Sequence, residues 1–173
     1  MLTGAENLLQ YARMKETEYP SAIATVDIIP FCYSQKTRSY EILLGRKEKH
    51  GGKLCFIGGF VDAELDNSFY DAAVREVREE VPTLLLTTGT QGLKYLYSKK
   101  VDDPRYREKK AKIFTSFFLL ETNKQNHEAG DDLNEVLWRD LDFLISNPEI
   151  LVDEHAELIA ELAMEIKWRT QRE

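Results

Sequence analysis

The sequence lacks the features of disulfide-rich, membrane-spanning and nucleic-acid-binding proteins. It has only two cysteines, Cys32 and Cys55, which match no zinc or disulfide pattern and are more typical of small buried apolar residues. No apolar run approaches the ~20 residues that a membrane-spanning helix needs. Residues 1–20 are polar and acidic where a signal peptide would be apolar, so we expect a cytoplasmic protein. The net charge of −7 argues against a nucleic-acid partner.

The composition is that of one soluble domain. The chain has 173 residues, of which 43% are hydrophobic and 31% charged, and this length suits a single core. An acidic protein can bind an anionic substrate only where metal ions or a local basic patch reverse the field.

Periodicity in the sequence predicts mixed secondary structure. Apolar alternation bounded by turn residues predicts strands at 22–33, 40–44, 53–57, 93–101, 113–121 and 135–138. Helical spacing predicts helices at 2–18, 68–81 and 153–171. Ser68 and Asp71 resemble a capping box for the second helix, and Pro82 stops it. Since strict βαβ alternation is absent, we expect an α/β domain whose mixed β-sheet is sandwiched between helices.

Three glutamates in the second predicted helix are the main chemical signal. Glu76, Glu79 and Glu80 share one helix face, where they repel one another unless cations lie between them. Mg²⁺ prefers hard oxygen ligands of this kind, and bound ions can polarise phosphorus and lower the pKa of an attacking water. The preceding Gly58-Gly59 pair allows a sharp turn and a backbone carbonyl ligand. The alternative interpretation is a solvated acidic face.

The same segment resembles the Nudix family, whose box reads G-x5-E-x7-R-E-U-x-E-E-x-G-U, with U an aliphatic residue. Gly59 matches the opening glycine, and residues 75–80, R-E-V-R-E-E, match the second half. The resemblance implies a single Nudix domain with catalytic residues Arg75, Glu76, Glu79 and Glu80. It also implies Mg²⁺, with Mn²⁺ as a possible substitute, bound by Gly59 and the three glutamates, which Arg75 orients. Segments 2–18 and 153–171 would be additions to the core.

The box departs from the family pattern in two places. The loop between Gly59 and Arg75 is two residues longer than the pattern, so the first glutamate of the box has no fixed counterpart. Glu64 and Asp66 are the candidates for it. Pro82 stands where the box has glycine, which changes how the chain leaves the helix.

Shorter matches over residues 19–146 resemble the branch of the family that cleaves ADP-ribose. They include I-L-L-G-R-K at 42–47, D-P-R at 103–105 and G-D-D at 130–132. We take Arg46, Arg105 and Asp131 as candidate substrate-binding residues. A solvated strand end for Arg46, a solvated basic hairpin for Arg105 and a capped turn for Asp131 remain open alternatives.

The sequence therefore predicts Mg²⁺-dependent hydrolysis of the diphosphate bond of ADP-ribose, or a related nucleoside diphosphate derivative, to two monophosphates. The alternatives are a Nudix hydrolase of another nucleotide, such as a sugar nucleotide, NADH, a dNTP or a dinucleotide polyphosphate, and a non-catalytic Nudix regulator. A homodimer is a further possibility, because relatives in the resembled branch are often homodimers. The spacing of His50, His127 and His155 indicates neither a triad nor a metal site, so we predict no functional role for them.

Overall fold

A computed structural model describes residues 21–84, 92–109, 111–131 and 133–170. The predicted helix at 2–18 lies outside these residues. The strands are β1 (Ala22–Ser34), β2 (Ser39–Arg46), β3 (Leu54–Cys55), β4 (Ile57–Phe60), β5 (Lys94–Val101), β6 (Lys112–Glu121) and β7 (Glu135–Asp140). The α-helices are α2 (Phe69–Glu80), α3 (Leu141–Ser146), α4 (Asp153–Ala156) and α5 (Ile159–Thr170).

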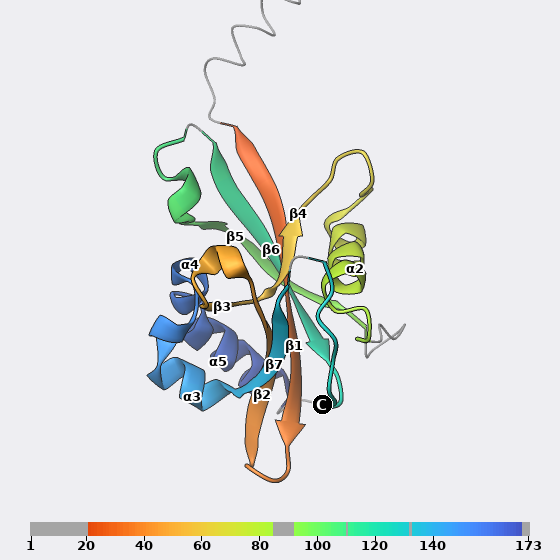
Figure 1. Cartoon of the computed structure of the whole chain (residues 1–173), viewed down its shortest axis with the longest axis vertical. Helices are drawn as coiled ribbons and strands as arrows, with labels where there is room; N and C mark the ends of the chain where they lie inside the picture. Colours follow the sequence, from red (N-terminus) through yellow and green to blue (C-terminus); the bar gives the residue numbers. More distant parts are fainter. Residues whose placement is uncertain (1–20, 85–91, 110, 132, 171–173) are drawn as a thin grey trace, which may run out of the picture.

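The strands form one mixed sheet, as predicted. Its order is β3-β2-β1-β6-β5, and β4 and β7 pair with β1 and β2 respectively. Strand β1 is parallel to β6 and antiparallel to its other partners. The first half of β1 pairs with β4 and its second half pairs with β2, so β2 and β4 diverge from each other along β1. This divergence brings β4 to the end of the sheet where α2 begins (Figure 1).

Helices cover both faces of the sheet (Figure 1). Successive side chains of a strand point to opposite faces, and β1 shows the effect: Ile28 packs toward α2, whereas Ile29 packs toward α3 and α5. Helix α2 buries Ala72, Ala73 and Val77 in the same apolar cluster as Ile28. The expected α/β class, with its mixed sheet sandwiched between helices, is therefore confirmed.

Helix α2 forms where the sequence predicts it and ends for the expected reasons. The Ser68 hydroxyl accepts a hydrogen bond from the Asp71 N–H at 3.1 Å and so caps the first turn. The helix ends at Glu80, two residues before Pro82. A proline cannot donate the backbone hydrogen bond that another turn would need.

Two predicted elements are divided in the structure. The strand expected at 53–57 is split into β3 and β4 at Phe56, whose N–H donates to His155 Nδ1 at 3.0 Å. The structure has two helices, α4 and α5, where one helix was expected from Asp153. Between them the N–H of Leu158 donates to the His155 carbonyl. Helix α3 was not predicted, because six residues are too few to show helical periodicity.

The helices of the described residues are too short or too polar to cross a lipid bilayer.

Candidate functional site

Strand β4 places two glycines against the carboxylates of α2. The Gly58 N–H donates to Glu80 Oε2 at 2.8 Å. A Cβ at Gly59 would lie 2.7 Å from Glu76 Oε2, so a larger residue there would displace the Glu76 carboxylate. Gly58 has a φ of 152°, and a Cβ there would clash with the Val26 carbonyl oxygen. Gly58 is therefore required for the close approach of β4 to β1, and Gly59 leaves room for the Glu76 carboxylate.

Arg75 connects the acidic groups of this region. Its Nη1 donates to Glu76 Oε1 at 2.8 Å and to Glu79 Oε2 at 2.9 Å. Its Nη2 donates to the Phe60 carbonyl at 2.8 Å. The planar guanidinium thus fixes two of the three glutamates relative to the end of β4.

The two candidates for the first glutamate of the box differ in their contacts. Asp66 accepts from Nε and Nη2 of Arg75 at 3.0 and 2.8 Å, and this pairing lowers the pKa of its carboxyl group. Glu64 is exposed and its N–H donates to Asp62. Asp66, rather than Glu64, therefore pairs with Arg75.

Two of the three glutamates are buried. Glu76 is 8% exposed and Glu80 is 1% exposed. Burial raises the pKa of Glu76, and it raises the pKa of Glu80 to about 7 against the opposing effect of Lys47. The Lys47 ammonium, itself buried, donates to Glu80 Oε1. A cation thus already lies against the most buried carboxylate.

The donor set of this region fits a hard divalent ion. Among the described residues, no group of three or more His, Cys, Asp or Glu side chains converges as a ready metal cluster. The carboxylates of Glu76 and Glu79 are turned toward Arg75. However, the Glu76 carboxylate lies close to Gly59, so carboxylates and a backbone carbonyl group occur in the same region. These are the ligand types that Mg²⁺ prefers.

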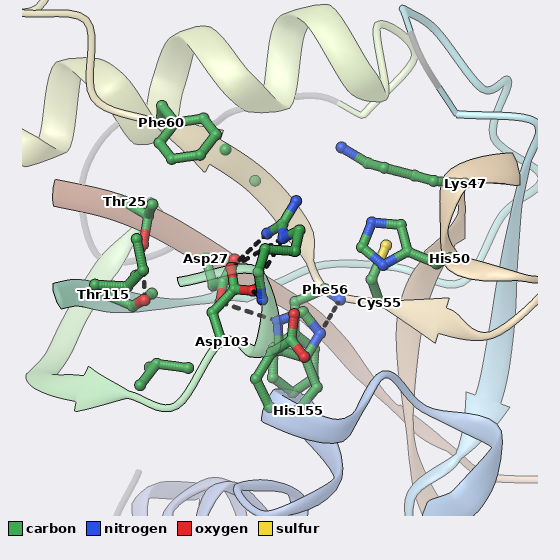
Figure 2. Close-up of a pocket in the computed structure, with 16 residues that line it drawn as sticks. Thr25, Asp27, Lys47, His50, Cys55, Phe56, Phe60, Asp103, Thr115 and His155 are labelled. Carbon is green, nitrogen blue, oxygen red and sulfur yellow. Dashed lines mark hydrogen bonds and ion pairs between the residues drawn. The ribbon is translucent and has the colours of Figure 1, made fainter. Parts of the chain in front are cut away.

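A cavity opens beside β4 (Figure 2). Its walls come from β1, β4, β6, the turn after β5 and α4. On one side Arg105 binds Asp103 through Nε and Nη2, at 2.6 to 3.1 Å. On another, the hydroxyls of Thr25 and Thr115 are 2.7 Å apart. The polar side chains in the wall of the cavity are therefore hydrogen-bonded to one another, among apolar neighbours such as Phe56 and Ile113.

The three predicted substrate-binding residues lie in different places. Arg105 lines the cavity beside β4. Arg46 lies outside its lining and pairs with Glu135 at 2.9 Å and with the Gly52 carbonyl. Asp131 borders another hollow, together with Lys47. The structure therefore does not bring the three together, and their roles in substrate binding remain predictions.

The loop that contains Asp131 packs against the end of α2. The Gly130 N–H donates to the Glu80 carbonyl at 2.8 Å, and a Cβ at Gly130 would clash with the Glu79 carbonyl oxygen. The glycine of the G-D-D segment thus allows this loop to contact the glutamate helix. Asp132 lies outside the described residues.

His155 belongs to the cavity although the sequence did not indicate it. Its Nδ1 accepts from the Phe56 N–H at 3.0 Å, its Nε2 lies 3.2 Å from Asp27 Oδ2, and its ring stacks on Phe56 (Figure 2). Asp27 and His155 are 128 positions apart in the sequence. No local spacing could have revealed the pair.

Comparison with known proteins agrees with this geometry. The model of the NUDIX domain matches residues 24–162, so the chain belongs to the Nudix family. A search of curated proteins found no match.

Solved structures show the same fold. A MutT/nudix family protein from Enterococcus faecalis is 27% identical, with a TM-score of 0.58 over 80% of this chain and 51% of that one. This chain thus spans about half the length of that protein. The NUDIX domain of Shewanella oneidensis NrtR, complexed with ADP ribose, is 20% identical, with a TM-score of 0.69 over 95% and 99%.

A third similar structure contains a nucleotide and a metal. It is the bifunctional NMN adenylyltransferase/ADP ribose pyrophosphatase from Francisella tularensis complexed with AMP and Mn ion. It is 20% identical, with a TM-score of 0.64 over 93% of this chain and 47% of that one.

Proposed function

We propose that this protein hydrolyses the diphosphate bond of ADP-ribose, or of a closely related nucleoside diphosphate derivative, with Mg²⁺ as its cofactor. The reaction adds one water across the P–O–P linkage and, with ADP-ribose, yields AMP and ribose 5-phosphate. The observation that carries the proposal is the glutamate cluster held by Arg75 against Gly59. It combines the family's R-E-x-x-E-E motif with the donor atoms that a divalent ion needs.

The chain's own residues prepare this site. Arg75 holds Glu76 and Glu79, and the Gly58 N–H holds Glu80. Glu76, Glu79, Glu80 and the Gly59 carbonyl would bind the metal ion. A bound ion would polarise the phosphate and lower the pKa of the attacking water. Arg75, paired with Asp66, limits the motion of the carboxylates, which preserves the geometry that in-line attack requires.

The choice of ADP-ribose is supported by the D-P-R and G-D-D segments and by two similar structures. One of these was solved with ADP ribose, and another is described as an ADP ribose pyrophosphatase. Arg105 of the D-P-R segment also lines the cavity beside β4. A substrate that reaches from the glutamates into this cavity would contact both parts of the site.

One observation favours a second candidate function, ligand binding without turnover. The Lys47 ammonium already neutralises Glu80, so the most buried carboxylate needs no metal ion to balance its charge. In that case the protein would be a Nudix regulator that senses its ligand.

A substrate panel separates the two functions. ADP-ribose, NADH, sugar nucleotides, diadenosine polyphosphates and dNTPs would be incubated with Mg²⁺, and the products measured by chromatography. We expect ADP-ribose to be cleaved with the highest kcat/KM. A dNTP or dinucleotide polyphosphate that is preferred tenfold would refute the substrate. Ligand-induced thermal stabilisation without any product would instead support the regulator.

A thermal scan tests the metal independently of activity. Mg²⁺ or Mn²⁺ should raise the melting temperature relative to EDTA, since the ion would bind the folded cluster and not the unfolded chain. In the Glu76→Gln variant this increase should shrink. Coincident curves for the wild type at millimolar metal would contradict the metal site.

A further inference from the structure

Asp27 lies at the inner wall of the cavity beside β4, between the sheet and α4 (Figure 2). It is on β1, opposite Gly58 of β4. Its side chain keeps 14% of its surface exposed. Within the described ranges Oδ2 contacts His155, and no hydrogen bond to Oδ1 is present. One carboxylate oxygen is thus held while the other can accept a hydrogen bond from a ligand.

His155 is held in one orientation and one tautomer. The Phe56 N–H donates to Nδ1, so this nitrogen carries no proton, and in the neutral ring the proton is on Nε2, which faces Asp27. The stacked ring of Phe56, with a centroid distance of 4.1 Å, prevents the imidazole from rotating. A backbone N–H and an aromatic ring thus position Asp27 through His155.

The charge of the cavity suits neutral polar groups better than phosphate. Arg105 is already paired with Asp103, and Lys47 with Glu80. His50 adds no positive charge at neutral pH, because burial and the nearby Arg105 lower its pKa to about 4. The acidic groups left over are Asp27 and Glu154. A phosphate would be repelled here, whereas a hydroxyl that donates a hydrogen bond would be attracted.

The cavity and the glutamates of α2 both contact β4. Gly58 and Gly59 line the cavity with one side of β4, while the Gly58 N–H binds Glu80 and Gly59 lies against Glu76. A diphosphate near the glutamates would therefore direct one of its attached sugars past the two glycines into the cavity.

From this geometry we infer that Asp27, positioned by His155, accepts a hydrogen bond from a ribose hydroxyl of the substrate and determines specificity for it. The inference rests on the proposed function, because it assumes a substrate in which ribose is attached to a diphosphate. It makes the cavity beside β4 the sugar subsite. His155 is a positioning residue, since it acts through Asp27 and not on the reacting atoms.

The test uses the two reaction products, which cannot be hydrolysed. Dissociation constants for AMP and for ribose 5-phosphate would be measured by NMR titration with the wild type and with Asp27→Asn. This isosteric change keeps an oxygen for the contact with His155 and removes the charged acceptor. We expect Kd to rise about tenfold for one of the two products. The product affected identifies which ribose occupies the cavity.

Deoxy analogues make the test specific. The matching 2-deoxy and 3-deoxy compounds should include one whose Kd is the same for the wild type and Asp27→Asn, because it lacks the hydroxyl that Asp27 binds. Asp142→Asn, an exposed aspartate of α3, is the matched control and should leave every Kd unchanged. Inorganic phosphate should bind both proteins equally.

His155→Asn tests the positioning role. Asparagine keeps an acceptor near the Phe56 N–H but lacks the nitrogen that contacts Asp27. We expect the same product to bind several-fold more weakly, and the double variant to bind no more weakly than Asp27→Asn alone. A merely structural role would weaken the deoxy analogues as well.

The inference is overturned if Asp27→Asn leaves both products unaffected, if it weakens all ligands equally, or if neither product binds the wild type. These titrations need no turnover, whereas the substrate panel does. A protein that binds ribose through Asp27 but hydrolyses nothing would therefore refute the proposed function alone.

Discussion

The glutamate face of α2 and the cavity beside β4 differ in how their carboxylates are arranged and paired. On α2 three carboxylates are adjacent, and the side chains of Arg75 and Lys47 hold them together. In the cavity two carboxylates have separate partners: Asp103 pairs with Arg105, and Asp27 contacts His155. Crowded carboxylates create a demand for cations, whereas separately paired ones leave single acceptor atoms for neutral ligands. The two regions are thus suited to different parts of one substrate.

The largest effect should come from a substitution in the glutamate face of α2. Glu76→Gln should lower kcat for ADP-ribose by at least about 100-fold, because a neutral amide weakens the site for a divalent ion that stabilises charge in the transition state. Steady-state kinetics with Mg²⁺ measure this. The matched control is Glu64→Gln in the neighbouring loop, which should retain wild-type kcat. Wild-type activity of Glu76→Gln would remove this residue from the catalytic site.

The buried Glu80 should make metal-free stability depend on pH. Its pKa of about 7 in the folded protein lies above that of an unfolded glutamate, about 4.3. The folded state therefore binds this proton more tightly than the unfolded state does. The resulting contribution of Glu80 to the free energy of unfolding is present below the unfolded pKa and is lost as pH rises through the folded pKa.

Denaturant unfolding in EDTA at pH 5 and pH 8 measures this effect. Glu80→Gln should destabilise the protein at pH 5 by about 2–3 kcal/mol more than at pH 8. The difference between variant and wild type isolates Glu80 and the groups coupled to it, because His50 and other distant titrating groups contribute equally to both proteins. An equal cost at both pH values would show that Glu80 does not titrate in this range.

Asp66 should affect the metal indirectly. Asp66→Asn weakens the pairing that orients Arg75, so the affinity for Mn²⁺ should fall about tenfold. Calorimetric titration of Mn²⁺ measures the change, and Glu64→Gln again serves as the control. If Glu64→Gln weakens binding more than Asp66→Asn, Glu64 rather than Asp66 is the counterpart of the first glutamate of the box.

The smallest effect should come from a substitution in the cavity beside β4. Arg105→Ala should raise KM for ADP-ribose about fivefold with little change in kcat, as expected for an interaction made equally in ground and transition states. Arg46→Ala should change KM less, because Arg46 lies outside the lining of the cavity. A larger effect of Arg46→Ala would place the substrate on the other side of Lys47, near Asp131.

Much of the fold could be predicted from the sequence. Strand β1, strand β6 and helix α2 were predicted to within about two residues, because apolar periodicity, Ser68 and Pro82 are local signals. The breaks at Phe56 and near Leu158 were missed for one shared reason. Both depend on His155, which binds the Phe56 N–H through its ring and the Leu158 N–H through its carbonyl.

The sequence by itself determined the glutamate cluster. One helix turn brings Glu76, Glu79 and Glu80 to one face whatever the rest of the chain does, and Arg75 is their immediate neighbour. The family pattern could be recognised for the same reason, since its residues are adjacent in the chain.

Only the tertiary structure decided what surrounds that cluster. The choice of Asp66 over Glu64 depended on the path of the longer loop, and the contact of Lys47 with Glu80 on the pairing of β2, β1 and β4. Asp27 and His155 meet because the chain after β7 brings α4 to the cavity beside β4, where β1 supplies Asp27. Contacts between distant segments depend on how strands pair and layers pack, and local periodicity carries no information about either.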